Sequence, residues 1–508
     1  MNHPPDHDPN ALLDAVLELR HDVEQEAGRR LAAWGVADAE PHVRASAENL
    51  ARYLALRRRH LADLQRALVE LGLSSLGRSE ARVRTQLDAV AATLGVLAGR
   101  TDAPPRPDAD AVWRGDRLLH ERALEALGPQ PSDRRVRVIA TLPSEAADDP
   151  ELVARLLRAG ADGVRINAAH DGPEAWTAMA AHARAAAAQQ GRSVFVEVDL
   201  AGPKVRVAEG APDGKQRVGD ALWLAATGWR PVDDLGAPTV ALTLPRLLAD
   251  VRVDDQVWFD DGRLGGRVER LEFAVPHGDG ALAGAPQVAV LVRVTHVLRR
   301  GQRVRVGKGV NFPDTVIDEV VPTDDDLAAL PTAVSIADAL GFSFVQRAGE
   351  VDALHDAIEA LAPARRPTVV LKIETRLAVR ALPSLIVAAL RRGPAAVMIA
   401  RGDLAVELGF ERLAEVQEEL LWICEAAHVP AIWATQVLEG VAKHGMPTRA
   451  EVTDAAMAER AEGVLLNKGP YAEYAVGTLA DVLRRMHRHQ HKKTANLAAL
   501  GAWAEDLP

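Results

Sequence analysis

Hydrophobic positions in the first part of the chain recur every three or four residues. Leucine and alanine follow this spacing through residues 11–34 and 48–73, which places an apolar stripe along one side of each helix. Prolines interrupt the pattern in TDAPPRPDAD, residues 101–110. This region contains no chemical motif, so residues 1–130 are predicted to form an all-α N-terminal extension, either a helical appendage or an oligomerisation surface.

From Val136 the pattern changes to short β-branched runs that alternate with amphipathic stretches. VRVIATL, DGVRINA and SVFVEVDLAGP are typical of strands, whereas ELVARLLRAGA and GPEAWTAMAAHARAAAAQQG are typical of helices. The alternation resumes near Thr332 and gives about eight strand-helix units in all, which indicates a parallel sheet. A repeat of roughly 250 residues with this alternation fits an α/β fold of the (β/α)8 TIM barrel type.

The helical pattern disappears between residues 207 and 306. DQVWFDDGRLGGRVERLEF, QVAVLVRVTHVL and GQRVRVGKGVNF alternate apolar and polar residues, as short antiparallel strands do. Barrel active sites lie at the carboxyl ends of the strands, so a small all-β insert in a barrel loop is expected to cover the site as a lid. The predicted domains are the helical extension at 1–130, the first part of the barrel at 131–206, a β-barrel-like lid at 207–306, the second part of the barrel at 307–490 and a C-terminal tail at 491–508.

Composition narrows the classes of protein that the sequence allows. The 508 residues carry a net charge of -11, which is the wrong sign for a protein that neutralises nucleic-acid phosphates. No apolar run approaches the roughly 20 residues that span a bilayer, and the N-terminus lacks a basic start followed by an apolar stretch. A single cysteine, Cys424, excludes an internal disulfide. We therefore expect a cytoplasmic enzyme that binds neither nucleic acid nor membrane.

Polar residues stand at the ends of the predicted strands, where a barrel brings them together. They are Arg165 and Asn167 in VRIN, Asp199 in EVDLAGP, Lys372 and Glu374 in LKIET, Asp403 in ARGD and Thr435 in ATQ. Two carboxylates with water and substrate oxygens suit Mg2+, which prefers hard oxygen ligands. Arg165 and Lys372 carry the positive charge that neutralises a phosphoryl group.

These segments resemble the pyruvate kinase family over residues 131 to about 490. The matching segments are VRVIATL, RAGADGVRINAAH, VEVDLAGPKVR, FDDGR, GKGVNFP, GFSFV, LKIET, ARGDLAVELG, PAIWATQVLEG and MPTRAEVTDAA, in the family's order and with its spacing. The resemblance implies a barrel interrupted by a small β lid domain. It also implies phosphoryl transfer from phosphoenolpyruvate to ADP, which gives pyruvate and ATP.

The resemblance assigns a role to each matching residue. Glu374 and Asp403 would hold Mg2+, for which Mn2+ can substitute. Lys372 would stabilise the phosphoryl group in transit and the enolate left behind, and Arg165 would bind the phosphate. The remaining assignments are the backbone N–H groups of Gly402 and Asp403 for the substrate carboxylate, Thr435 for the place where the enolate is protonated, and Asn167, His170 and Arg206 for the nucleotide and its phosphates.

The sequence departs from the family where potassium normally binds. The family reads RLNFSH and DTKGPE, whereas this chain reads RINAAH and DLAGPK. Asn167 and Asp199 remain, but Ala169, Leu200 and Lys204 replace a serine, a threonine and a glutamate. A lost ligand hydroxyl and a new ammonium resemble the family branch that works without potassium. Lys204 is therefore expected to substitute internally for K+, and the activity to require no monovalent cation.

Two further departures concern the nucleotide and regulation. The family's lysine before GPE is Ala201, and its SGETA segment reads NKGPY at Asn467–Tyr471, which removes a carboxylate and adds Lys468. Family members usually continue into a carboxyl-terminal α/β domain that hosts sugar-phosphate effectors, whereas this sequence ends at Pro508. Control through such a domain is not expected, and the N-terminal helices are expected to support a homo-oligomer.

Two other functions remain open at this stage. A barrel lyase that acts through a metal-bound pyruvate enolate also needs a Glu and an Asp on Mg2+, although it has no phosphoryl group for Lys372 or a lid to enclose. The other alternative is a non-catalytic regulatory homologue whose N-terminal helices bind a partner.

Overall fold

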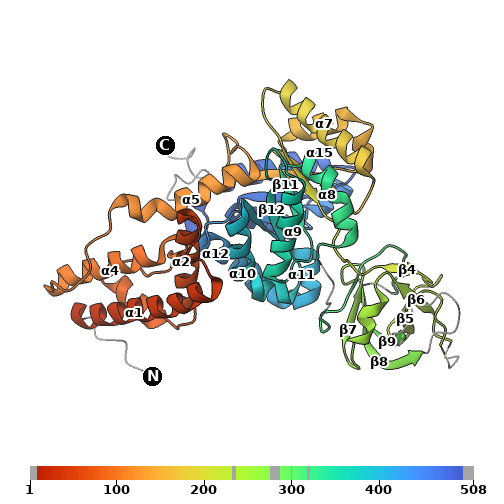
Figure 1. Ribbon diagram of the computed structural model, residues 1–508, viewed down its shortest axis with the longest axis horizontal. Helices are drawn as coiled ribbons and strands as arrows, with labels where there is room; N and C mark the ends of the chain where they lie inside the picture. The colour runs from red at the N-terminus through yellow and green to blue at the C-terminus, as the bar shows by residue number, and fades with distance from the viewer. Residues whose placement is uncertain (1–7, 232–235, 275–286, 299, 317–320, 496–508) are drawn as a thin grey trace, which may run out of the picture.

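The computed structural model describes residues 8–231, 236–274, 287–298, 300–316 and 321–495. Its centre is a closed barrel of parallel strands, which lies between the N-terminal helices on one side and a separate β sheet on the other (Figure 1). The barrel strands are β1 (Arg137–Thr141), β2 (Gly163–Asn167), β3 (Phe195–Asp199), β11 (Ala339–Phe342), β12 (Thr368–Ile373), β13 (Ala395–Ala400), β14 (Ala431–Ala434) and β15 (Gly463–Leu466). Their order around the barrel is β1-β15-β14-β13-β12-β11-β3-β2, which confirms the predicted fold class.

Helices follow the barrel strands and cover their outer side. They are α6 (Pro150–Ala159), α7 (Pro173–Gln189), α8 (Asp324–Ile336), α9 (Ala348–Ala360), α10 (Arg376–Arg392), α11 (Arg401–Leu408), α12 (Phe410–Ala426), α13 (Glu439–His444), α14 (Arg449–Met457) and α15 (Ala472–Met486). In α6 the Asp149 side chain caps the first turn by accepting from Leu152 N at 3.0 Å, and Gly160 ends the helix at φ 117°. Among the residues that the structure describes, no helix is long and apolar enough to cross a membrane.

The insert between β3 and β11 folds as a seven-stranded sheet with its own apolar core. Its strands are β4 (Val207–Glu209), β5 (Ala221–Ala225), β6 (Thr239–Leu242), β7 (Gln256–Phe259), β8 (Leu264–Ala274), β9 (Gln287–Val297) and β10 (Val310–Asn311). The pairing is antiparallel except between β5 and β6, which are parallel, so an all-antiparallel insert is wrong at that pair. An isolated bridge between Arg206 and Gly309 links the two ends of the strand order. This insert is called the lid below.

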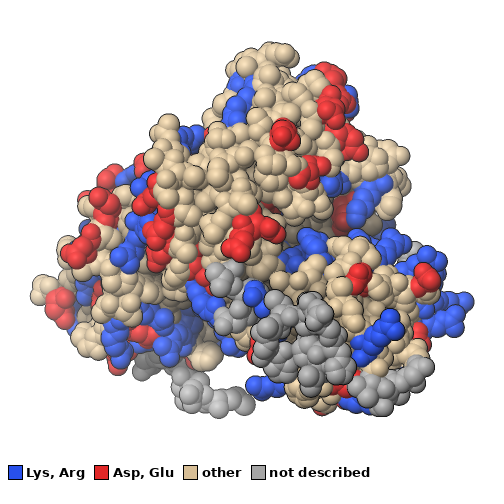
Figure 2. Space-filling model, turned by 45° about the vertical axis from the view of Figure 1, so that its right-hand side comes forward, with Lys and Arg blue, Asp and Glu red and all other residues tan. Residues whose placement is uncertain are grey.

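The N-terminal segment consists of α1 (Pro9–Trp34), α2 (Pro41–Leu56), α3 (Ala62–Glu70), α4 (Val83–Ala98) and α5 (Ala109–Leu127). The apolar sides of these helices are buried, and α2 packs against α10 and α12 of the barrel. Figure 2 shows acidic and basic side chains interspersed over one face of the molecule. Of the predicted C-terminal tail, residues 496–508 lie outside the described residues.

A buried polar network joins the N-terminal helices to the loop between α12 and β14. His428, in that loop, is 2.9 Å from Ser46 Oγ through Nδ1 and 2.9 Å from Ala81 O through Nε2. Arg122 of α5 donates to Ser46 Oγ at 2.8 Å and to the carbonyl oxygens of Ala427, His428 and His42 at 3.1, 3.0 and 3.1 Å. The contacts of His428 with Ser46 and Ala81, and those of Arg122 with Ala427 O and His428 O, cross between the N-terminal helices and the barrel, so they form only while the helices remain docked.

Acidification is expected to weaken this docking through His428. Burial lowers the pKa of His428 to about 4 from its ordinary value of 6.5, although the bond to Ala81 O opposes the shift. Between these values the unfolded state binds more protons than the folded state, so the free energy of unfolding falls as the pH drops from 6.5 toward 4. For this group the loss at pH 5 is about 2 kcal/mol. Urea denaturation at pH 7 and pH 5 measures it.

The comparison that isolates His428 uses two variants. His428→Gln should show a smaller loss of stability between the two pH values than the wild type, because the titrating ring is gone. His60→Gln, which changes an exposed histidine, should keep the wild-type difference. Equal pH dependence in His428→Gln and the wild type would contradict the prediction.

Candidate active site at the carboxyl ends of the barrel strands

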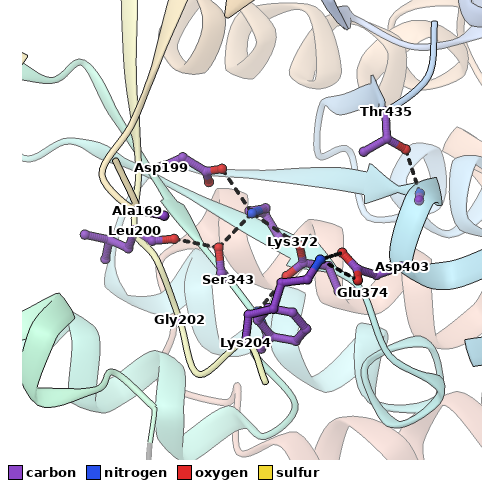
Figure 3. Close-up of polar contacts among 12 residues, drawn as sticks. Ala169, Asp199, Leu200, Gly202, Lys204, Ser343, Lys372, Glu374, Asp403 and Thr435 are labelled. Atoms are coloured by element: carbon purple, nitrogen blue, oxygen red, sulfur yellow. Dashed lines mark hydrogen bonds and ion pairs between the residues drawn. The ribbon is translucent and has the colours of Figure 1, made fainter. Parts of the chain in front are cut away.

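Lys372 lies at the centre of a buried group of charged side chains (Figure 3). Its Nζ donates to Ser343 Oγ at 2.7 Å and to Asp199 Oδ2 at 3.0 Å, and lies 3.2 Å from Glu374 Oε1. The residue is only 8 % exposed. Burial alone would lower the pKa of the Lys372 ammonium, but Asp199 and Glu374 outweigh it and the pKa is raised. The barrel therefore holds a fixed positive charge in a site nearly closed to water.

Asp199 joins Lys372 to Arg165. Arg165 Nε donates to Asp199 Oδ2 at 3.0 Å, and Arg165 Nη2 contacts the same oxygen. Among the described residues Asp199 Oδ1 has no hydrogen-bond partner, and a Cβ added to Gly341 would approach this oxygen to 2.0 Å, so only glycine fits there. Burial alone would raise the pKa of Asp199, but Arg165 and Lys372 lower it by more. The pKa is therefore below its ordinary value and the carboxylate stays ionised. One carboxylate thus orients two cations that β2 and β12 supply.

Glu374, which is buried, and Asp403, which is partly buried, are neighbouring carboxylates that follow β12 and β13. Glu374 Oε2 accepts from Phe344 N at 2.7 Å. Burial is the largest effect on the pKa of Glu374 and raises it. The positive charge of Lys372 opposes this shift and the negative charge of Asp403 adds to it, so the pKa is raised. A divalent cation would relieve this repulsion, and carboxylate oxygens are its preferred ligands. Within the described residues no group of three or more His, Cys, Asp or Glu side chains could hold a metal ion, so this pair would leave other coordination positions to water and substrate.

The Lys204 ammonium forms an ion pair with the Asp403 carboxylate. Its Nζ donates to Asp403 Oδ1 at 2.8 Å and Oδ2 at 3.1 Å (Figure 3). Asn167 Oδ1, at the position where the family binds potassium, accepts from Ala169 N of its own loop at 3.1 Å. Burial lowers the pKa of Lys204, and Asp403 raises it by more. The added positive charge therefore neutralises a carboxylate of the candidate metal pair.

Thr435 lies directly after β14 in a left-handed conformation, with φ 66°. This φ is unusual for a β-branched residue and marks a backbone that its surroundings hold in place. Arg401 donates to Ala434 O at 3.0 Å and to Thr435 O at 2.7 Å, and is paired with Asp454. Thr435 Oγ1 accepts from Gly402 N at 2.7 Å, so the first turn of α11 and the threonine hydroxyl face each other.

Among the described residues, His170 and Arg206 form no hydrogen bond or ion pair with this buried group. His170 is exposed, and Arg206 Nη1 donates to Gly307 O of the lid at 3.0 Å. Burial, then Lys468 and Arg206, lower the pKa of His170. The structure thus brings together Arg165, Lys372, Glu374, Asp403 and Lys204, and places His170 within the electrostatic influence of Lys468 and Arg206.

Two contacting residues were missed at the sequence level. Ser343 accepts from Lys372, and Asn311 of the lid donates through Nδ2 to Asp403 Oδ1 at 3.3 Å. Both lie inside segments that resemble the family, GFSFV and GKGVNFP. Ser343 directly follows β11, and Asn311 is the last residue of β10. Their position at the end of a strand is the feature of the sequence that could have identified both residues.

The fold and site define a barrel protein whose cations and carboxylates suit a phosphorylated substrate. The pyruvate kinase barrel-domain family profile matches residues 133–473. The pyruvate kinase of Mycobacterium intracellulare is 29% identical over 360 residues, which cover 69% of this chain and 70% of the relative. That of Mycobacterium tuberculosis is 30% identical over 363 residues, which cover 69% of this chain and 70% of the relative. The chain belongs to the pyruvate kinase family.

Proposed function

We propose that the chain transfers the phosphoryl group of phosphoenolpyruvate to ADP, giving pyruvate and ATP. The observation that carries the proposal is the buried Lys372 ammonium, held by Asp199 and Ser343 beside the Glu374 and Asp403 carboxylates. Phosphoryl transfer needs positive charge fixed where the phosphoryl oxygens pass, because positioning and electrostatic stabilisation are most of its catalysis. The names of the relatives support the same reaction.

Each residue has a defined task in this proposal. Arg165 binds the phosphate of phosphoenolpyruvate, and Asp199 keeps its guanidinium aimed into the site. Lys372 neutralises the phosphoryl group in transit and then the enolate oxygen that it leaves. Glu374 and Asp403 hold Mg2+ or Mn2+, which supplies a Lewis acid for the phosphoryl oxygens when bound.

The remaining groups position the two substrates. The backbone N–H groups of Gly402 and Asp403 receive the substrate carboxylate at the start of α11, and this requires Thr435 Oγ1 to release Gly402 N. The Thr435 hydroxyl then lies where the enolate is protonated. Asn167, His170 and Arg206 contact the nucleotide and its phosphates.

The test is a lactate dehydrogenase-coupled assay of the purified chain with phosphoenolpyruvate, ADP and Mg2+. Turnover that requires all three components is the expected result. A protein that binds Mg2+ but shows no turnover in this assay would favour the lyase or the non-catalytic alternative, and a pyruvate-enolate aldol assay separates those two.

We also propose that the reaction proceeds without K+. Ala169 and Leu200 stand where the family has hydroxyl side chains, and the Lys204 ammonium adds a fixed positive charge to the carboxylate group. The rate at saturating substrates should agree within about twofold in K+, Na+ and choline buffers, because no exchangeable monovalent ion is needed. A rate that collapses in choline and recovers with K+ contradicts the proposal.

Variants at Lys204 sharpen this comparison. Lys204→Glu should lower the rate strongly in every buffer, because it sets a third carboxylate beside Glu374 and Asp403. Lys215→Glu makes the same charge change at an exposed lysine of the lid and should behave as the wild type.

A further inference from the structure

A short hairpin follows α15 and lies at the amino end of β15. Its strands β16 (Gln490–His491) and β17 (Thr494–Ala495) pair antiparallel, and Lys492 and Lys493 form the turn between them. A two-stranded hairpin of this kind is at most marginally stable by itself. Lys492 also has φ 55°, a left-handed conformation that is uncommon outside glycine. Contacts of the turn with its surroundings must therefore hold the hairpin in place.

Lys492 attaches this turn to the barrel. Its Nζ donates to Arg460 O at 3.0 Å and forms an ion pair with Glu462, which directly precedes β15. The Glu462 Oε2 atom accepts from Ala431 N, at the first residue of β14, at 2.9 Å. Both members of the ion pair are buried. The pair therefore anchors the turn at the amino ends of two barrel strands.

Lys493 attaches the same turn to the N-terminal helices. Its Nζ forms an ion pair with Glu80, the first residue of the short 3-10 helix η1 (Glu80–Arg82) that leads into α4. Glu80 is only 3 % exposed, and its Oε1 atom also accepts from Tyr53 OH of α2 at 3.3 Å. A buried carboxylate that loses its cation is strongly destabilising. The docked position of Glu80 therefore depends on the hairpin.

The indole ring of Trp422, in α12, contacts cations from both of the other parts. Lys493 Nζ lies 5.0 Å from the ring centroid, and the guanidinium carbon of Arg57, at the end of α2, lies 4.4 Å from it. Both distances are within the range of about 6 Å over which a cation is attracted to an aromatic face. The barrel, the N-terminal helices and the hairpin thus meet at one junction.

We infer that the hairpin is a releasable clasp, which couples the opening of its own turn to the undocking of the N-terminal helices from the barrel. Withdrawal of Lys493 leaves Glu80 buried without a cation, whereas undocking returns Glu80 to water, so opening of the hairpin favours undocking. Undocking in turn removes Glu80 from the junction and leaves the hairpin with its barrel contacts alone. The hairpin and the N-terminal helices therefore open as one cooperative unit.

The test is amide hydrogen exchange of the full chain, measured by mass spectrometry. Lys493→Met should speed exchange about tenfold in the hairpin and in α2 and α4, while β12 keeps its wild-type rate. Lys493→Arg keeps the charge that faces Glu80 and Trp422, so its rates should stay within about threefold of the wild type. Lys443→Met is the matched control, because it removes an exposed lysine paired with Glu439 of its own helix and should leave these rates unchanged.

Glu80→Gln separates coupling from a simple loss of stability. Glutamine fills the same space without a charge, so an open hairpin no longer leaves a buried carboxylate unpaired. Adding Lys493→Met to Glu80→Gln should therefore speed exchange in the hairpin but change it in α2 and α4 by less than about twofold. Faster exchange of the hairpin alone in Lys493→Met overturns the inference. Equal acceleration of β12, or an undiminished effect on α2 and α4 in the Glu80→Gln background, overturns it as well.

Discussion

Replacing Lys372 with methionine is expected to lower kcat for phosphoenolpyruvate and ADP at least about 1000-fold. Methionine has a similar length and fills the same buried space, but it carries no charge to stabilise the phosphoryl group or the enolate. Asp199 and Glu374 also lose a cation at 3.0 and 3.2 Å, which adds repulsion where an anionic substrate must bind. The coupled assay at saturating substrate measures the loss.

Three further measurements separate chemistry from folding. The thermal midpoint of Lys372→Met should show that the barrel is intact, and Lys443→Met, at an exposed position, should keep full activity. Lys372→Arg should rescue little, because the planar guanidinium does not fit where a compact ammonium meets Asp199, Ser343 and Glu374. If the Lys372→Met variant keeps a tenth of the wild-type kcat, Lys372 does not have the proposed role in the reaction.

Replacing Arg122 with methionine is expected to lower the free energy of unfolding by about 3 kcal/mol. The guanidinium donates to Ser46 Oγ and to three carbonyl oxygens between the N-terminal helices and the barrel. Methionine fills part of the space but leaves those buried acceptors without donors. Urea denaturation at pH 7, followed by circular dichroism and by tryptophan fluorescence, measures the change.

The control for Arg122 is Arg114→Met, which alters an exposed arginine of the same helix. It should change the free energy of unfolding by less than about 0.5 kcal/mol. If Arg122→Met unfolds at the same urea concentration as Arg114→Met, the network contributes nothing to the docking of the N-terminal helices.

Local patterning was sufficient to predict the barrel. Strands such as Arg137–Thr141 are buried on both sides and read as continuous apolar runs, while the intervening helices show a clear period. Candidate residues that end strands, such as Lys372 and Glu374, were predictable because parallel strands bring their carboxyl ends together.

Contacts between the lid and the barrel were not predictable in the same way. The partner of Lys204 is Asp403, 199 positions away, and that pairing depends on how the lid loop returns to the barrel. The parallel pairing of β5 and β6 likewise depends on chain routing rather than on residue pattern. The side-chain direction of Asn311 on β10 follows from the same routing.

Strand β14 connects two parts of the molecule that are distant in sequence. Its amino end follows the loop of His428, on which the N-terminal helices dock, and its carboxyl end leads directly to Thr435. The strand has four residues, so it spans roughly 13 Å. If undocking of the N-terminal helices changes substrate affinity through the position of Thr435, substrate binding must change the docking of those helices by the same free energy.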